Sequence, residues 1–300
     1  MASDRLKELR KSLVHVGLFG AACVTTNMAQ GTAFAATLMS ILVFHEAGHY
    51  LVARRHGLPV SLPYFIPLPP QWTFGTLGAL IGLREPIEDR NQLVDVAAAG
   101  PLAGLVVAIP LLVVGLALSP VSISHDPGTI IEGNSLAYLG LKYIVTGKVL
   151  PGADGLDVQL HPMAFGAWVG LIVTMINLIP IGQLDGGHLA AVILGDRNER
   201  WSKTLHLGLV IVGISVAIWL IGDALGQGLE LEDAVSYAFP SAMPWIVWAG
   251  VLLLFRRAGD RYHPEVNSDP LSFGRRVLVG VVITVFVLIF TPVPLRSALP

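Results

Sequence analysis

The chain has 300 residues, of which 53% are apolar and only 13% are charged. Globular proteins carry about 25% charged residues, so this composition is typical of a membrane protein and excludes an ordinary water-soluble enzyme. The net charge of −2 gives no support for binding of nucleic acid or of acidic substrates. The single cysteine, Cys23, excludes a disulfide within the chain.

Seven apolar stretches come close to the ~20 residues that a helix needs to cross a bilayer. The first of them is the weakest, because its apolar pattern is interrupted by His15, Thr25, Thr26 and Asn27. We predict an all-α polytopic membrane protein with about seven transmembrane helices, at 12–29, 33–55, 93–118, 163–181, 204–222, 242–256 and 274–292.

The positive charges are distributed unevenly between the connecting segments. With the N-terminus in the cytoplasm, all but three of the 19 Lys and Arg residues fall inside; the exceptions are Lys142, Lys148 and Arg296. This bias follows the positive-inside rule and predicts a cytoplasmic N-terminus and an outside C-terminus. No transit peptide is evident, so we expect a prokaryotic plasma membrane as the location, in preference to a plastid.

Residues 57–83 interrupt the pattern between the second and third spans. Five prolines between Pro59 and Pro70 exclude a regular helix over 57–74, and the stretch 75–83 is apolar but short and rich in glycine. Irregular backbone at membrane depth is tolerated only against protein or a wet cavity. We therefore predict a short re-entrant or β-hairpin-like loop, with a surface loop as the alternative.

Two further segments carry structural predictions without chemistry. Residues 119–162 form a polar outer loop that is too small for a typical folded domain, and 135–147 within it is expected to be a short interfacial helix. The stretch Gly100-Pro101-Leu102-Ala103-Gly104 is expected to be a face of small residues that lets two helices approach closely.

The string His45-Glu46-Ala47-Gly48-His49 lies near the end of the apolar run that begins at Ala33. Residues four apart share one face of a helix, so the two imidazoles can bind one ion. Glu46 falls beside the open coordination position, where a carboxylate can take a proton from an attacking water. Histidine and glutamate are costly inside lipid and usually mark function there. The pattern predicts a zinc-dependent peptide hydrolase inside a membrane.

Catalytic zinc usually has a third protein ligand. His56 lies about 10 Å further along the helix and cannot share the ion. Glu85 and Glu88 belong to a charged stretch that is typical of a solvated turn. Asp185 lies between a proline five residues earlier and two glycines, so a helix break should direct its carboxylate into the bundle. Asp185 is the preferred ligand; a helix cap is its alternative role.

The stretch from Asn177 to Gly186 reads NLIPIGQLDG, so the chain carries HExxH and NxxPxxxLDG on separate spans. With these motifs it resembles the site-2 protease family of intramembrane zinc metalloproteases, most closely over 33–195. The resemblance implies that His45, His49 and Asp185 bind one Zn²⁺ and that Glu46 is the general base. It implies for Asn177 a role in holding substrate or stabilising the oxyanion, although bridging of two helices is an alternative.

The resemblance extends to residues 75–104, between the two motifs. It implies that the loop at 75–83 receives the unwound substrate as an added strand, with the contacts made by Gly75, Thr76, Leu77, Gly78 and Ala79. The expected substrate is the transmembrane segment of another protein in the lipid bilayer, already cut once by another protease, as in regulated intramembrane proteolysis. We expect one membrane-embedded protease domain over 1–300, without the PDZ or CBS module of many bacterial members.

Two other functions remain possible on the sequence. A metal or solute transporter also has broken helices and polar residues near the midplane. A catalytically inactive relative would bind membrane proteins without cutting them. Glu46 argues against both, because neither a carrier nor a binding protein needs a base beside its metal ligands.

Overall fold

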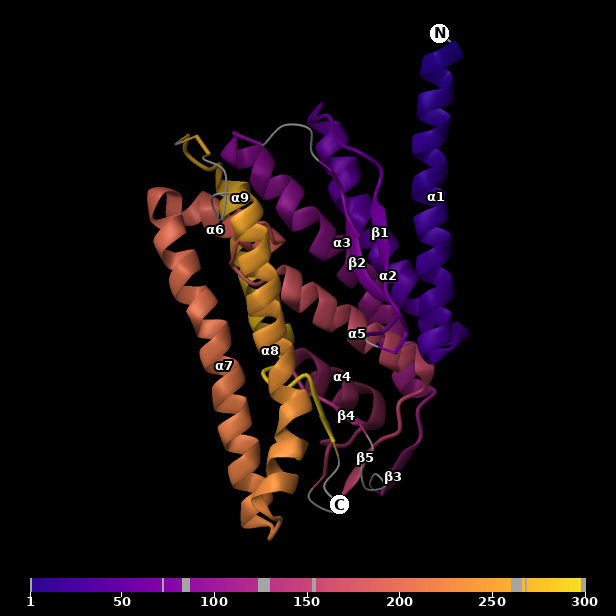
Figure 1. The fold of residues 1–300 in the computed structure, drawn as a ribbon, viewed down its shortest axis with the longest axis vertical. Coiled ribbons are helices and arrows are strands. Elements are labelled where there is room, and N and C mark those ends of the chain that lie inside the picture. Colours follow the sequence, from indigo (N-terminus) through magenta and orange to yellow (C-terminus); the bar gives the residue numbers. More distant parts are fainter. Residues whose placement is uncertain are drawn as a thin grey trace. The chain divides into compact units, whose positions relative to one another are not determined.

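A computed structural model describes residues 2–71, 73–82, 87–123, 130–152, 155–259, 266–267 and 269–297, most of which are helical (Figure 1). The mainly α-helical class is therefore confirmed. Glu85 lies outside the described residues. The chain forms two compact units: Met1–Ile87 with Asn91–Pro120 and Gln159–Thr174, and Glu88–Arg90 with Val121–Val158 and Met175–Pro300.

The first unit contains three long helices and a small sheet. Its elements are α1 (Ala2–Gln30), α2 (Thr32–Arg55), β1 (Tyr64–Pro67), β2 (Thr76–Leu80), nearly all of α3 (Arg90–Ala117) and most of α5 (Pro162–Asn177). β1 and β2 pair antiparallel, with an irregularity between Phe65 and Pro67. The segment that the sequence could not assign between a loop and a hairpin is thus a two-stranded hairpin, and α1 packs along β1 (Figure 1).

The second unit combines helices with two small sheets. Its elements are β3 (Val121–Ile123), β4 (Ile130–Glu132), α4 (Leu136–Thr146), β5 (Leu156–Val158), α6 (Asp185–Leu194), η1 (Gly195–Arg197), α7 (Asn198–Gly226), α8 (Leu231–Gly259), α9 (Phe273–Ile289) and β6 (Leu295–Ser297). The strands pair antiparallel, β3 with β5 and β4 with β6. α7 and α8 run side by side (Figure 1), and Leu220, Ala224 and Ala234 are fully buried between them.

In the part of the chain that the structure describes, four helical stretches are long and apolar enough to cross a membrane: Ser12–Gln30, Arg90–Ala117, Asp185–Gly226 and Leu231–Leu254. Each of them overlaps one of the seven predicted spans. α2 is long enough with 24 residues, but it is not among these four, because the polar residues of the histidine motif lower its mean hydropathy. α5 and α9 have 16 and 17 residues. The remaining three spans stay predictions.

The predicted start of the sixth span was wrong by eleven residues, because α8 begins at Leu231 and not at residue 242. Pro240 and Pro244 lie inside α8. A proline removes one backbone hydrogen bond and usually ends or kinks a helix. α8 continues through both prolines while α7 packs along it, so tertiary packing overrides the local signal.

The helix predicted at 135–147 is confirmed as α4, and its place at the membrane interface stays a prediction. The Ser135 hydroxyl accepts a hydrogen bond from the Tyr138 N–H at its N-terminus, and Gly147 ends it in the left-handed conformation. Within residues 119–162, Lys142 is fully buried, and its Nζ lies 3.0 Å from carboxylate oxygens of both Glu132 and Asp157. Burial raises the pKa of Tyr138 well above its ordinary value, and Glu132, which accepts a hydrogen bond from the Tyr138 hydroxyl, adds to the shift.

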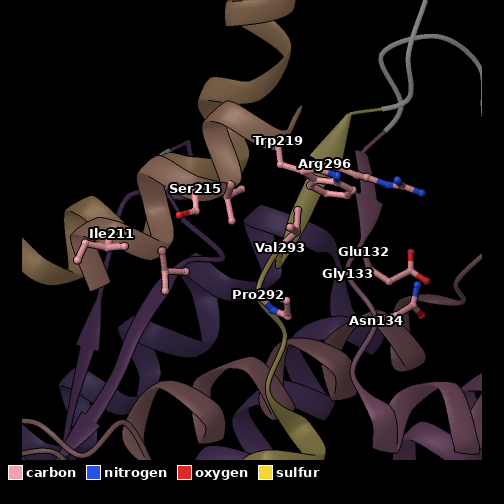
Figure 2. A pocket seen from close by; sticks show the side chains of 11 residues that line it. Glu132, Gly133, Asn134, Ile211, Ser215, Trp219, Pro292, Val293 and Arg296 are labelled. Atoms are coloured by element: carbon pink, nitrogen blue, oxygen red, sulfur yellow. The ribbon is translucent and has the colours of Figure 1, made fainter. Parts of the chain in front are cut away.

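A cavity of about 560 Å³ opens beside Glu132 in the second unit. Side chains of α7, among them Ile211 and Trp219, line the cavity together with Glu132 and with Arg296 of β6 (Figure 2). The cavity lining therefore combines apolar side chains with the Glu132 carboxylate and the Arg296 guanidinium.

Candidate metal centre

α2 places His45 and His49 on one face, as the spacing of four residues predicts. Both side chains are buried, and their Nε2 atoms lie 3.1 Å apart. The ring planes are inclined by 71°, so the two nitrogens converge while the rings avoid one another. Two buried imidazoles that converge in this way can bind one ion.

A carbonyl of α3 fixes the tautomer of His49. Nδ1 of His49 lies 2.8 Å from the Val96 carbonyl oxygen. Because a carbonyl oxygen only accepts, Nδ1 must carry the proton, and in the neutral ring the lone pair is then on Nε2. An outer hydrogen bond of this kind orients a metal-binding imidazole and raises its basicity. The nitrogen that faces His45 is therefore the one prepared to bind metal.

Small residues on α3 make room for these imidazoles. A Cβ built at Gly100 would overlap the His49 ring, and one at Gly104 would lie 3.4 Å from the His45 Cβ. Val96, Gly100 and Gly104 follow one another at intervals of four, so they lie on one face of α3. On this face the Val96 carbonyl accepts the hydrogen bond from His49, Gly100 leaves room for the His49 ring, and Gly104 lies beside His45. The predicted close packing is confirmed, and the groups that pack here include the two imidazoles of the histidine motif.

Glu46 is buried on α2 with an exposed fraction of 4%. His56, which the sequence excluded from the ion, binds a different group: its Nε2 lies 3.0 Å from Oδ2 of Asp95 on α3, and both side chains are partly exposed. Glu88, in the second compact unit, has no role that the described contacts assign to it.

The predicted helix break near Pro180 is confirmed. α5 ends at Asn177 and α6 begins at Asp185, with turns between them. A Cβ at Gly186 would overlap the Leu178 carbonyl, and one at Gly187 would overlap the Gly182 carbonyl. The loop folds back so closely on the start of α6 that only glycine fits at these two positions.

Asp185 occupies the first turn of α6 and is partly buried. The unpaired N–H groups of a helix start favour a carboxylate at this place. The N-cap itself is Leu184, so Asp185 is not the N-cap residue. Asn177, the last residue of α5, is also partly buried.

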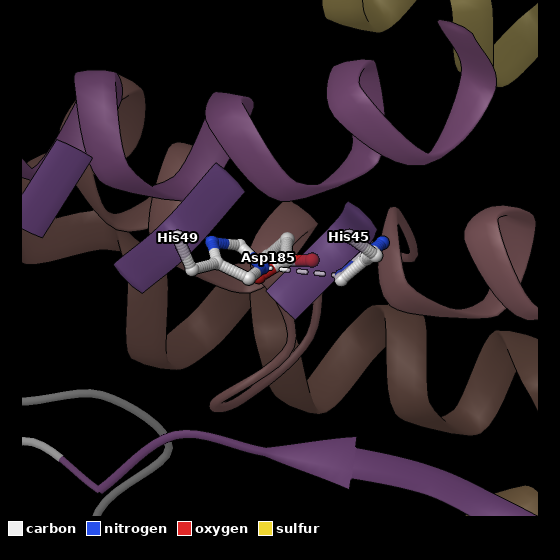
Figure 3. Close-up of side chains that lie close together, drawn as sticks. All are labelled: His45, His49 and Asp185. Atoms are coloured by element: carbon white, nitrogen blue, oxygen red, sulfur yellow. Dashed lines mark hydrogen bonds between the residues drawn. The ribbon is translucent and has the colours of Figure 1, made fainter. Parts of the chain in front are cut away.

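His45, His49 and Asp185 form a group that can hold one metal ion, with donor atoms that all lie within 4.8 Å of one another (Figure 3). Two imidazoles and one carboxylate are a donor set of catalytic zinc. Zinc–nitrogen bonds of about 2.0–2.1 Å in tetrahedral geometry place two nitrogens about 3.3–3.4 Å apart. The 3.1 Å between the His45 and His49 nitrogens is close to this value. The residues fit one zinc ion.

Apolar helices with such a group define the chain as a membrane metalloprotein. The model of Peptidase family M50 matches residues 33–220, which is more than half of the chain. The chain therefore belongs to Peptidase family M50, the site-2 protease family, and the resemblance drawn from HExxH and NxxPxxxLDG is confirmed.

Curated relatives agree with this family. The chain is 35% identical over 179 residues to the "Probable zinc metalloprotease EGY2, chloroplastic" of Oryza sativa subsp. indica. These residues cover 59% of this chain and 31% of the relative. It is 30% identical over 262 residues to the "Probable zinc metalloprotease EGY1, chloroplastic" of Arabidopsis thaliana. Here the aligned residues cover 85% of this chain and 42% of the relative. The chain thus spans less than half the length of these relatives.

Proposed function

We propose that the protein is an intramembrane zinc metalloendopeptidase that hydrolyses peptide bonds within transmembrane segments of other proteins. The observation that supports it most is the group formed by His45, His49 and Asp185, with Glu46 buried on the same helix as the histidines. A zinc ion held by this group supplies a Lewis acid that polarises a carbonyl and acidifies water.

The protein's own residues carry the proton transfers. Glu46 takes the proton from the attacking water and then returns it to the leaving amine, so one carboxylate acts first as base and then as acid. Asn177, at the end of α5, donates its side-chain amide to the negative charge that develops on the carbonyl oxygen. The Val96 carbonyl holds His49 in its binding tautomer throughout.

We propose that the substrate pairs with β2. In the sheet that the structure describes, β2 has one strand partner, β1, so its other edge is available for strand addition. Leu77 and Leu80 on β2 are 41% and 57% exposed. A transmembrane helix must unwind before hydrolysis, and the edge of β2 at Gly75 to Ala79 offers the backbone partners for the unwound segment. The hairpin is re-entrant in this proposal and lies at membrane depth.

We further propose seven spans in one membrane-embedded domain, with the N-terminus in the cytoplasm of a plasma membrane, as the distribution of Lys and Arg supports. Arg54 and Arg55 end α2 and lie at the cytoplasmic interface. At ~1.5 Å per residue, His49 is then very roughly 8–14 Å below that surface. Water reaches the site from the cytoplasmic side, and the substrate is a membrane protein that another protease has already cut.

The test is cleavage of a model spanning peptide in detergent micelles by the wild type and by Glu46→Gln. General acid–base catalysis contributes about 10²–10⁴-fold, so we expect a loss of that size with zinc content and helix content unchanged. Glu199→Gln changes a partly exposed carboxylate on α7, which pairs with Lys203, in the same way and should have no effect. Retained cleavage in Glu46→Gln would exclude Glu46 as the base. Zinc binding without any cleavage by the wild type would favour a carrier or an inactive relative.

A further inference from the structure

α1 contacts the β1–β2 hairpin at three successive levels. Nδ1 of His15 donates to the Pro63 carbonyl oxygen at 2.9 Å, and the His15 ring lies 4.1 Å from the Tyr64 ring. One turn further along α1, Phe19 meets Phe65 edge to face at 5.0 Å. These two levels fix the start of β1 against α1.

The third level is at the far end of the hairpin. The Thr25 hydroxyl donates to the Gly75 carbonyl oxygen at 2.6 Å, although the Ala21 carbonyl of its own helix is also within reach at 2.9 Å. A hydroxyl has one proton to donate, and the shorter contact is the one to the hairpin. Gly75 has φ +87°, and a Cβ there would lie 2.5 Å from the Thr25 backbone. The hairpin end therefore lies directly on α1.

The spacing of the two polar contacts matches the length of the hairpin. His15 and Thr25 are ten residues apart, which is about 15 Å along a helix. From Pro63 to Leu68, whose N–H donates to the same Gly75 carbonyl, an extended chain covers about 16–17 Å. α1 and β1 therefore run in the same direction, with a side-chain donor of α1 at each end of the strand.

Aromatic residues hold the same end of the hairpin from other helices. Phe74, next to Gly75, packs against Phe34 of α2 and Phe165 of α5, with ring centroids 5.9 and 5.6 Å away. Thr25 thus binds the Gly75 carbonyl, while Phe34 and Phe165 hold the ring of the neighbouring Phe74. The end of the hairpin is fixed before β2 begins.

We propose that His15 and Thr25 are positioning residues for substrate binding: they hold the hairpin on α1 so that β2 presents its open edge in one register. A shift of one residue would turn every side chain of a strand to the opposite face. The proposal rests on the proposed function, because it takes β2 as the strand that receives the substrate. Neither residue touches the substrate or the metal ligands in this role.

The experiment compares Thr25→Val and His15→Phe with the wild type, and Thr25→Ser as the conservative variant. Valine keeps the volume of threonine without the donor, and phenylalanine keeps a ring against Tyr64 without the donor. Two readouts are taken on the full-length protein in micelles. Hydrogen exchange follows the amides of 61–82, among them the Leu68 N–H that shares the Gly75 carbonyl. Steady-state cleavage of the model spanning peptide gives kcat and KM separately.

We expect Thr25→Val and His15→Phe to speed hydrogen exchange in 61–82 and to raise KM about two- to tenfold, with kcat and zinc content unchanged. Thr25→Ser should restore both readouts. Thr284→Val is the matched control, because Thr284 is exposed on α9 and donates to the Gly280 carbonyl of its own helix.

The two readouts separate the possible failures. Unchanged exchange in 61–82 would show that the donors do not hold the hairpin, and would overturn the proposal. Faster exchange with an unchanged KM, or a fall in kcat alone, would overturn the positioning role while leaving the contact itself established. A wild type that does not cleave would refute the proposed function, and with it this role, irrespective of the exchange result.

Discussion

Substitution of Gly100 by alanine tests whether α3 controls the metal site. A Cβ at this position would lie 2.5 Å from Cε1 of His49 and closer still to Nε2 and Cδ2. Carbon atoms in favourable contact are about 3.5–4.0 Å apart, so the imidazole must move by about 1 Å. Metal–ligand distances tolerate deviations of only about 0.2 Å. The shift also strains the 2.8 Å hydrogen bond from His49 to the Val96 carbonyl.

We therefore expect Gly100→Ala to lower zinc affinity about 10–100-fold, the range found when an outer hydrogen bond of a metal ligand is lost. The assay is competition for zinc with a chromogenic chelator, with the helix content checked by circular dichroism. An alanine in a helix interior is usually about 0.8–1.0 kcal/mol more favourable than glycine, so weaker metal binding would oppose the ordinary effect of the change.

Gly104→Ala is the matched control for this substitution. Gly104 lies one turn along the same helix and faces the other imidazole, but its added Cβ would make only a 3.4 Å contact with the His45 Cβ. We expect its zinc affinity to stay within about twofold of the wild type, in the absence of an overlap. Equal affinity for zinc in Gly100→Ala and Gly104→Ala would refute the inference that Gly100 seats His49.

Two further substitutions test the ligand set and the segment 119–162. Asp185→Asn keeps the shape of the side chain but removes its charge, so zinc affinity should fall by at least about tenfold in the chelator assay; wild-type affinity would exclude Asp185 as a ligand. Lys142→Met leaves the buried Glu132 and Asp157 carboxylates without their cation, and should lower the free energy of unfolding by about 3–5 kcal/mol. Denaturant unfolding measures this loss, and zinc affinity is the second readout. An unchanged free energy of unfolding would contradict the prediction.

The features that the sequence predicted correctly depend on local patterns. A spacing of four residues was enough to place His45 and His49 on one helix face. A proline followed by glycines was enough to predict the break between α5 and α6. Four spans followed from runs of apolar residues, and α4 from the pattern at 135–147. Each of these signals lies within about twenty consecutive residues.

The features that it missed depend on contacts between distant residues. His49 and the Val96 carbonyl are 47 positions apart, and His15 and the Pro63 carbonyl are 48 apart. Lys142 was counted among the outer charges of a polar loop, yet it is fully buried between two carboxylates. A single sequence shows which side chains need a partner, but not which distant group supplies it.

Two of the four polar residues that weakened the prediction of the first span, His15 and Thr25, have a structural explanation of their own. His15 and Thr25 both donate to the hairpin, whereas Leu13, Val16 and Met28 on the same helix are 65–67% exposed. A hydrogen-bonding group in lipid is costly unless it is paired, so polar side chains in a span indicate the face that contacts protein. The same physical cost that reduced the apolar character of α1 therefore identifies the face that holds the hairpin, just as it identified the metal-binding face of α2.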